Sequence, residues 1–87
     1  MYRRFRKEKD MLEKVIEILK GINEDVDYTQ EKALIDNEIL DSFDVVGLVS
    51  ELQDEFDVEI VVDYLTPENF NSAESICNLI ERLQNGD

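Results

Sequence analysis

Apolar side chains recur every three or four residues in three stretches of the chain, the spacing that gathers them on one face of an α-helix. The first stretch predicts a helix that ends near Gly21, and the second predicts a helix from Ser42 to about Phe56. The third predicts a final helix that begins after Asn71 or Ser72. The three apolar faces comprise Leu12, Val15, Ile16, Leu19 and Ile22; Val45, Leu48, Val49, Leu52 and Phe56; and Ala73, Ile76, Cys77, Ile80 and Leu83.

Side chains that cap helices stand at two of the predicted helix starts. Asp41 or Ser42 is a natural N-cap for the second helix, and Asp44 adds a favourable negative charge to its first turn. For the final helix, Asn71 with Glu74 three residues later fits a capping box. We therefore expect each of these helices to begin at one of these polar residues.

The connection between the first two helices, residues 23–41, is long for a loop inside a small domain. A structureless loop of this length is uncommon, so its apolar side chains are expected to pack onto the core. These side chains are Tyr28, Leu34, Ile35, Ile39 and Leu40.

Residues 58–62, VEIVV, favour a β-strand by composition, but no second convincing strand exists to pair with them. We interpret them as a loop that leads into a short helical turn from Val62 to Leu65, ended by Thr66 and Pro67. The predicted fold is therefore all-α, a four-helix bundle with three main helices, one short third helix and a long first loop.

Charge is distributed unevenly along the 87 residues, whose net charge is −13. Residues 1–9 carry five Lys or Arg and one Glu, so the remainder carries −17. We expect residues 1–10 to be a basic N-terminal extension or a leader before a start at Met11, and residues 11–87 to form a single domain. The alternative for the first ten residues is a solvated extension of the first helix. The acidic domain repels nucleic acid and anionic lipid and favours basic protein surfaces.

Several classes of function are disfavoured by what the sequence lacks. It contains no histidine, which removes His-based acid–base catalysis, and Ser42 has no residue to activate it as a nucleophile. The DVD sequence at residues 25–27 begins like a calcium loop, but Gln30 stands where that loop needs glycine, so we predict no metal site.

Cys77, the single cysteine, fits a reducing cytoplasmic setting and a core position. No apolar run is long enough to insert stably into a membrane.

Ser42 remains the residue of interest, because its hydroxyl stands between Asp41 and Asp44 at a predicted helix start. On this local pattern it is either a plain N-cap or a point of attachment. The wider window DSFDVVGLVSELQDEFDVEI resembles the acyl carrier protein family, in which an Asp-Ser-Leu motif opens the second helix and leads to an acidic stretch. The resemblance covers residues 11–85 and includes the order of helices, so the protein is expected to be a freestanding carrier and not an enzyme.

This resemblance implies that Ser42 receives 4′-phosphopantetheine from coenzyme A, attached by a separate phosphopantetheinyl transferase, with Asp41 beside it in the cofactor site. The arm would carry an acyl or aminoacyl group as a thioester and shuttle it from a loading ligase or synthase to downstream acyltransferases with basic docking patches. The carrier is expected to be a monomer. Ile60, Val61 and Leu65 are expected near an opening that shelters the cargo. The residues expected to contact partners are Phe43, Asp44, Val46, Glu51, Asp54 and Glu55.

Two positions depart from the family pattern. Phe43 replaces the usual leucine, and Gly47 replaces a commonly acidic residue. Both would face partners, so we expect a specialised pathway that is polyketide-like, aminoacyl-transferring or devoted to cell-envelope acylation. The alternatives are a housekeeping carrier of fatty-acid synthesis and, in a different class, a small acidic helical interaction module with an unmodified Ser42.

Overall fold

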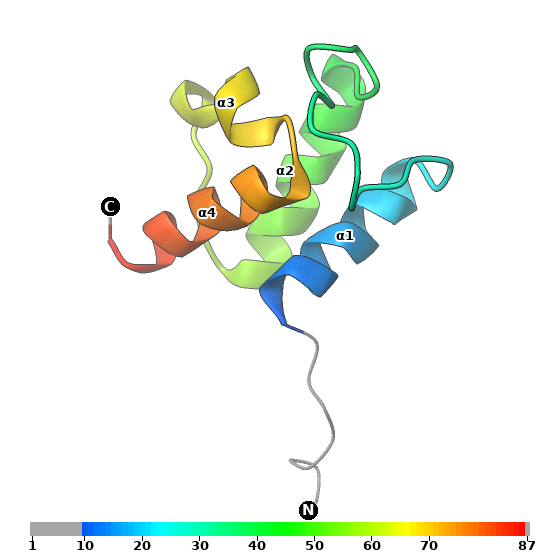
Figure 1. The fold of residues 1–87 in the computed structure, drawn as a ribbon. Helices are drawn as coiled ribbons and strands as arrows, with labels where there is room; N and C mark the ends of the chain where they lie inside the picture. The colour runs from blue at the N-terminus through cyan, green and yellow to red at the C-terminus, as the bar shows by residue number, and fades with distance from the viewer. Residues whose placement is uncertain (1–9, 87) are drawn as a thin grey trace, which may run out of the picture.

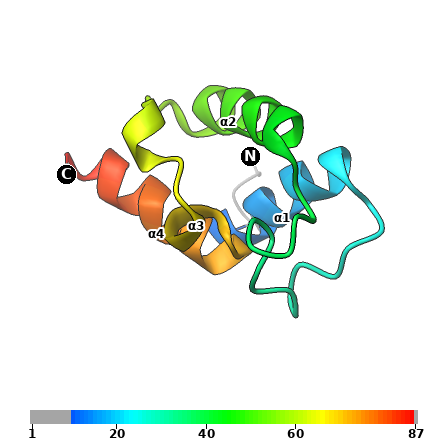
Figure 2. The same ribbon diagram turned by 90° about the horizontal axis from the view of Figure 1, so that it is seen from above.

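The computed structural model describes residues 10–86, in which the regular elements are helices and no β-strand occurs. The predicted all-α class is therefore confirmed. Figures 1 and 2 show α2 along one side of the bundle, with α3 and α4 on the other. In chain order the elements are α1 (Met11–Ile22), α2 (Ser42–Phe56), the 3₁₀ helix η2 (Val62–Tyr64), α3 (Pro67–Phe70) and α4 (Ala73–Gln84).

Helix α1 begins at Met11 because Asp10 caps it. The Asp10 backbone is extended, its carboxylate accepts the Glu13 N–H, and the Glu13 carboxylate accepts the Asp10 N–H. The helix therefore does not continue upstream through Asp10. The predicted basic extension otherwise lies outside the described residues.

The prediction for the region around Pro67 was only partly right. The expected short turn exists as η2, but Pro67 does not end the helical structure: it is the first residue of α3. Proline suits this position because its fixed φ is helical and its missing N–H would have no partner there. The residue that the pattern indicates as a stop signal therefore acts as a helix start.

The capping box predicted for the last helix was wrong. Asn71 cannot be an N-cap because it still has helical backbone angles, with its N–H bonded to the Pro67 carbonyl at 2.8 Å. Ser72 has the extended backbone that an N-cap requires, and its hydroxyl accepts the Ser75 N–H at 3.1 Å. Ser75, and not Glu74, therefore completes the box.

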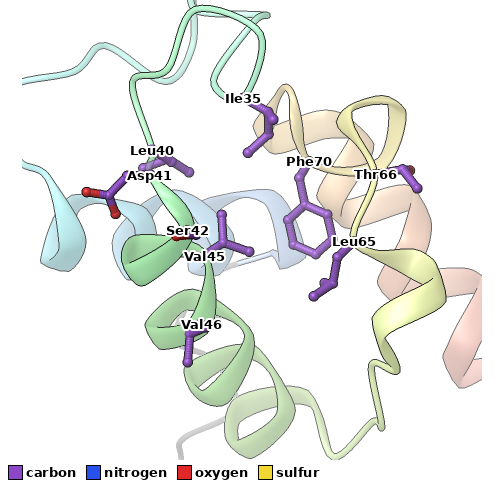
Figure 3. Close-up of a pocket in the computed structure, with 9 residues that line it drawn as sticks. All are labelled: Ile35, Leu40, Asp41, Ser42, Val45, Val46, Leu65, Thr66 and Phe70. Atoms are coloured by element: carbon purple, nitrogen blue, oxygen red, sulfur yellow. The ribbon is translucent and has the colours of Figure 1, made fainter.

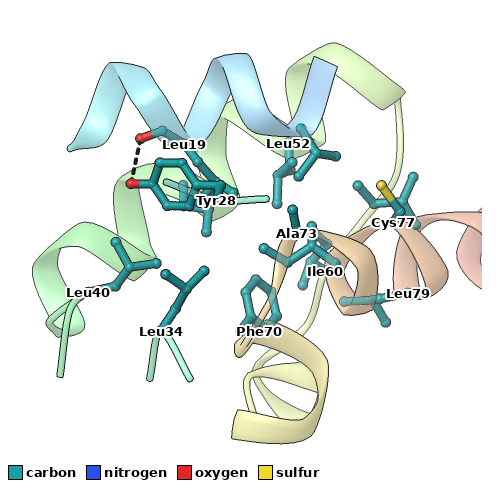
Figure 4. Close-up of a cluster of buried hydrophobic side chains, with 14 residues drawn as sticks. Leu19, Tyr28, Leu34, Leu40, Leu52, Ile60, Phe70, Ala73, Cys77 and Leu79 are labelled. Carbon is teal, nitrogen blue, oxygen red and sulfur yellow. Dashed lines mark hydrogen bonds between the residues drawn. The ribbon is translucent and has the colours of Figure 1, made fainter. Parts of the chain in front are cut away.

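The core lies where the helices meet: α1 packs against α2 and α4, and α3 packs against α4. The long connection contributes as predicted, since Tyr28, Leu34 and Leu40 are buried and Ile35 and Ile39 are half-buried. Figure 4 shows Tyr28, Leu34 and Leu40 beside buried residues of the helices. No helix within residues 10–86 is both long and apolar enough to cross a membrane.

Cys77 lies in this core, as predicted. Burial raises the pKa of its thiol to about 11, and the nearby carboxylates of Glu81 and Glu74 add to the effect. Since the thiolate is the reactive form, this thiol is inert at neutral pH.

Tyr28 fastens the long connection to the end of α1. Its hydroxyl donates to the Leu19 carbonyl at 3.2 Å and to the Asn23 carbonyl at 2.7 Å, and Figure 4 shows the first of these bonds. Burial, followed by the charge of Asp44, raises the pKa of Tyr28 above its ordinary value, so the hydroxyl keeps the proton that it donates. The phenol thus closes the C-terminal end of α1.

Replacing Tyr28 with phenylalanine is therefore expected to lower the free energy of unfolding by about 1–2 kcal/mol. The partly buried Asn23 carbonyl loses the donor, and the Leu19 carbonyl keeps only the Asn23 N–H, while the ring stays in place. Urea denaturation monitored by circular dichroism measures the loss. Tyr64→Phe serves as the matched control, because Tyr64 is only half-buried. A loss of the same size in the control would show that the two Tyr28 hydrogen bonds are not the cause.

Candidate functional site

The candidate site is the first turn of α2, where the helix cap is Asp41. The Asp41 carboxylate accepts the Asp44 N–H at 2.8 Å, and the Asp44 carboxylate accepts the Asp41 N–H at 3.3 Å. Asp41 has an extended backbone, and Ser42 is the first residue with helical geometry. The structure thus decides between the two predicted caps in favour of Asp41.

The Ser42 hydroxyl is consequently not needed for capping. The residue is exposed, and within residues 10–86 no hydrogen bond involves its side chain. The interpretation of Ser42 as a plain N-cap is therefore wrong for this helix. Its oxygen is accessible to another molecule at no cost to the helix start.

A cavity of about 340 Å³ lies beside Ser42, between the start of α2 and the segment from η2 to α3. Figure 3 shows the side chains of Val45, Leu65 and Phe70 converging on this space, while the Asp41 carboxylate points away from it. Most of the wall is apolar, and the cavity is lined by Ile35, Leu40, Asp41, Ser42, Val45, Val46, Leu65, Thr66 and Phe70.

Ile60, Val61 and Leu65 were predicted to lie near the opening of a cargo cavity. Of these, Leu65 lines this cavity, whereas Ile60 and Val61 do not. Ile60 is buried in the core, and its N–H donates to the Gln53 side chain at 2.8 Å. In an irregular segment, helical or strand periodicity does not determine which way a side chain points. Ile35 and Phe70, which the sequence did not assign to the site, form part of the wall.

The predicted partner residues divide between two sides of α2. Phe43 and Val46 are 84% and 66% exposed and stand beside Ser42. Asp54 is also exposed, whereas Asp44 is half-buried in the cap. The structure therefore presents an apolar surface, and not only carboxylates, next to the hydroxyl.

Glu51 and Glu55 face α1 instead. Glu55 pairs with Lys14 of α1, with 3.6 Å between the ammonium and the carboxylate. Glu51 borders a second hollow of about 260 Å³ together with Ile18, Gly21 and other residues of α1. These two carboxylates do not adjoin the Ser42 surface.

Residues 10–86 contain no group of three or more His, Cys, Asp or Glu side chains that could hold a metal ion. What the site offers is an accessible hydroxyl on a rigid helix start, with an apolar cavity on one side. Such an arrangement suits the attachment of a group that is held covalently and partly sheltered.

Comparisons with known proteins agree with this geometry. No protein-family model matches the chain. Curated relatives from Streptococcus sanguinis, Streptococcus gordonii and Streptococcus thermophilus are each 32% identical to it over 77 residues. Each match covers 87% of this chain and 98% of the relative, and all three relatives are named D-alanyl carrier protein.

Proposed function

This chain belongs to the acyl carrier protein family, and we propose that it carries its cargo as a thioester on a 4′-phosphopantetheine arm joined to Ser42. The observation that supports this assignment is the state of the Ser42 hydroxyl. It is exposed on the first turn of α2, where the neighbouring Asp41 supplies the cap. A modification there would remove no interaction of the fold.

The surroundings of Ser42 fit a phosphodiester that is attached, not merely bound. The Ser42 and Phe43 amides have no partner within the helix, and the positive end of the helix dipole lies there, which favours a phosphate. The Asp44 N–H is already bonded to the Asp41 carboxylate. The carboxylates of Asp41 and Asp44 act in the opposite sense, because like charges repel. With these effects opposed, a covalent bond is what would keep the group in place.

Attachment would proceed by substitution at phosphorus, catalysed by a separate transferase. The Ser42 oxygen would form a bond to the phosphorus that carries the pantetheine, and the bond from that phosphorus to the oxygen of the departing adenosine bisphosphate would break. The hydroxyl proton would pass to a base of the transferase. When attached, the group supplies a terminal thiol that holds the cargo. The residues of this chain present the arm and recognise the partners.

Partner recognition is proposed to use the surface around Ser42, consisting of Phe43, Val46 and Asp41, together with the exposed Asp54 about three turns further along α2. The two exposed apolar side chains would fill apolar sockets, while the acidic field of the domain would speed the encounter with basic enzymes. Glu51 and Glu55, which face α1, would contribute to this field without making contacts beside the arm.

For the cargo we propose an aminoacyl group, with D-alanine as the first candidate, because the three relatives carry that name. The cavity favours a second candidate, an apolar acyl chain, since its volume of about 340 Å³ and its apolar wall suit an alkyl group. An ammonium group would lose its hydration there and would remain outside.

Loading kinetics distinguish the two candidates. The protein carrying its arm is incubated with ATP and a ligase that loads D-alanine onto carrier thiols, and separately with a ligase that loads fatty acids. We expect kcat/KM for D-alanine to lie within about tenfold of that for a streptococcal relative, a difference of about 1.4 kcal/mol. Fatty-acid loading should lie well below that of a fatty-acid carrier. The reverse order would assign the protein to apolar acyl chains.

A further inference from the structure

Asn71, at the junction of α3 and α4, binds three successive backbone amides of the connection that leads to α2. Its carbonyl accepts the Leu34 N–H at 2.9 Å. Its side-chain oxygen accepts the N–H groups of Ile35 and Asp36 at 2.9 and 3.1 Å, and its side-chain amide donates to the Asp36 carboxylate at 3.0 Å. One residue thus holds the beginning of the turn formed by residues 34–40.

Asn71 is itself fixed on both sides. Its N–H donates to the Pro67 carbonyl at 2.8 Å as the C-cap of α3, and Ser72 caps α4 immediately after it. The donors and acceptors of Asn71 therefore belong to a rigid corner between two helices, and the turn is held against that corner.

The turn formed by residues 34–40 connects the corner at Asn71 to the start of α2. The Leu34 carbonyl accepts the N–H groups of both Ile39 and Leu40, at 2.9 and 3.1 Å, which closes the turn on itself. Leu40 is followed directly by Asp41, the cap of α2. A chain of hydrogen bonds therefore runs from the corner at Asn71 to Leu40, two residues before Ser42.

The same turn forms a wall of the cavity. Ile35 and Leu40 line it from the turn, and Figure 3 shows Ile35 on the same side of the cavity as Phe70, which immediately precedes Asn71. Since α2 packs against α1 and α3 packs against α4, the turn is a link between α3 and the first turn of α2. Within residues 10–86, the exposed Lys32–Glu74 ion pair also joins the connection to α4, but exposed pairs of this kind contribute little to stability.

We propose that Asn71 is a positioning residue for the carrier site: by holding the 34–40 turn against the α3–α4 corner, its side chain fixes Ser42 relative to the mouth of the cavity. This inference rests on the proposed function of Ser42. It assigns to Asn71 a role different from the helix cap that the sequence suggests.

An exchange of the two polar partners tests the proposal. Asn71→Asp retains an acceptor for the two amides but sets two carboxylates against each other. Asp36→Asn retains the acceptor for the Asn71 amide and serves as the matched control. The double variant Asp36→Asn/Asn71→Asp restores an amide donor opposite a carboxylate acceptor, with the same single negative charge as the wild-type pair. Hydrogen exchange of the Ile35 and Asp36 amides, measured by NMR on protein without the arm, should rise in Asn71→Asp and return to the wild-type rate in the double variant.

The second measurement is kcat/KM of a phosphopantetheinyl transferase for each variant. We expect a loss of about tenfold for Asn71→Asp, of the kind caused by a misplaced reacting group, with recovery in the double variant. Tyr28→Phe is destabilised at a site outside the turn and should keep the wild-type kcat/KM.

Unchanged amide exchange in Asn71→Asp, failure of the double variant to recover, or an equal loss of kcat/KM in Tyr28→Phe would each overturn the positioning role. If wild-type protein is not modified at all, the proposed function fails. The amide exchange experiment would still show whether Asn71 holds the turn.

Discussion

Replacing Ser42 with alanine is expected to abolish the addition of phosphopantetheine while leaving the fold unchanged. The reason for the first effect is chemical, since alanine has no oxygen to bond to phosphorus. The reason for the second is structural, since Asp41 and Asp44 form the cap of α2 through their own side chains and backbone. Intact mass after incubation with coenzyme A and a broad-specificity transferase measures the first effect, and circular dichroism measures the second.

Ser50→Ala is the matched control, because Ser50 is also an exposed serine on α2. This variant should gain one phosphopantetheine group, as the wild type does. Addition that persisted in Ser42→Ala would place the attachment elsewhere. A wild-type protein that remained unmodified by more than one transferase would favour the alternative of an acidic interaction module.

Replacing Phe70 with alanine is expected to cause the largest loss of stability, about 3–5 kcal/mol, because a buried ring is removed from the core. Phe70 is 1% exposed and also forms a wall of the cavity beside Ser42. Small domains have a total stability of about 5–15 kcal/mol, so this change would leave part of the population unfolded if the protein lies at the lower end. Urea denaturation measures the change.

Phe43→Ala provides the comparison with the same side chain removed. Phe43 is 84% exposed, so its removal should change the free energy of unfolding by no more than about 0.5 kcal/mol. On the proposed function it should instead lower kcat/KM of the transferase or the loading enzyme. Equal losses of stability in the two variants would contradict the positions of these rings in the fold.

The helices were predictable because their apolar residues repeat at a fixed spacing over three turns or more. Residues such as Leu48 and Leu52 are fully buried, as the repeat requires. Four-residue α3 is too short for a repeat to be visible, and Pro67 can either end a helix or begin one. The choice depends on tertiary structure, here the packing of α3 on α4.

The caps show a second limit. Asp41, Ser42, Asn71 and Ser72 all have side chains that can cap a helix, and sequence spacing does not tell which one has an extended backbone. In the structure, Asp41 and Ser72 have the extended backbone and act as the N-caps. Asn71 is turned instead toward residues 34–36, more than thirty positions earlier in the chain. A contact between such distant residues leaves no local pattern in one sequence.

The candidate site was located by resemblance and not by periodicity. Ser42 could be named because the window around it matches a family pattern, and the relatives confirm the family. The residues that line the cavity could not be predicted with the same accuracy. Its walls come from the turn, from α2 and from α3, so their relative placement depends on tertiary contacts such as those of Asn71.

The assignment of the helix cap to Asp41 has a thermodynamic consequence for the loading cycle. If the attachment residue itself capped α2, each modification would sacrifice a hydrogen bond of the helix, and folding stability would be linked to the fraction of loaded protein. Here the two equilibria are independent at this residue. On the proposed function, unloaded and loaded molecules would therefore present the same backbone at the start of α2, and an enzyme that acts on only one of them would have to detect the arm itself.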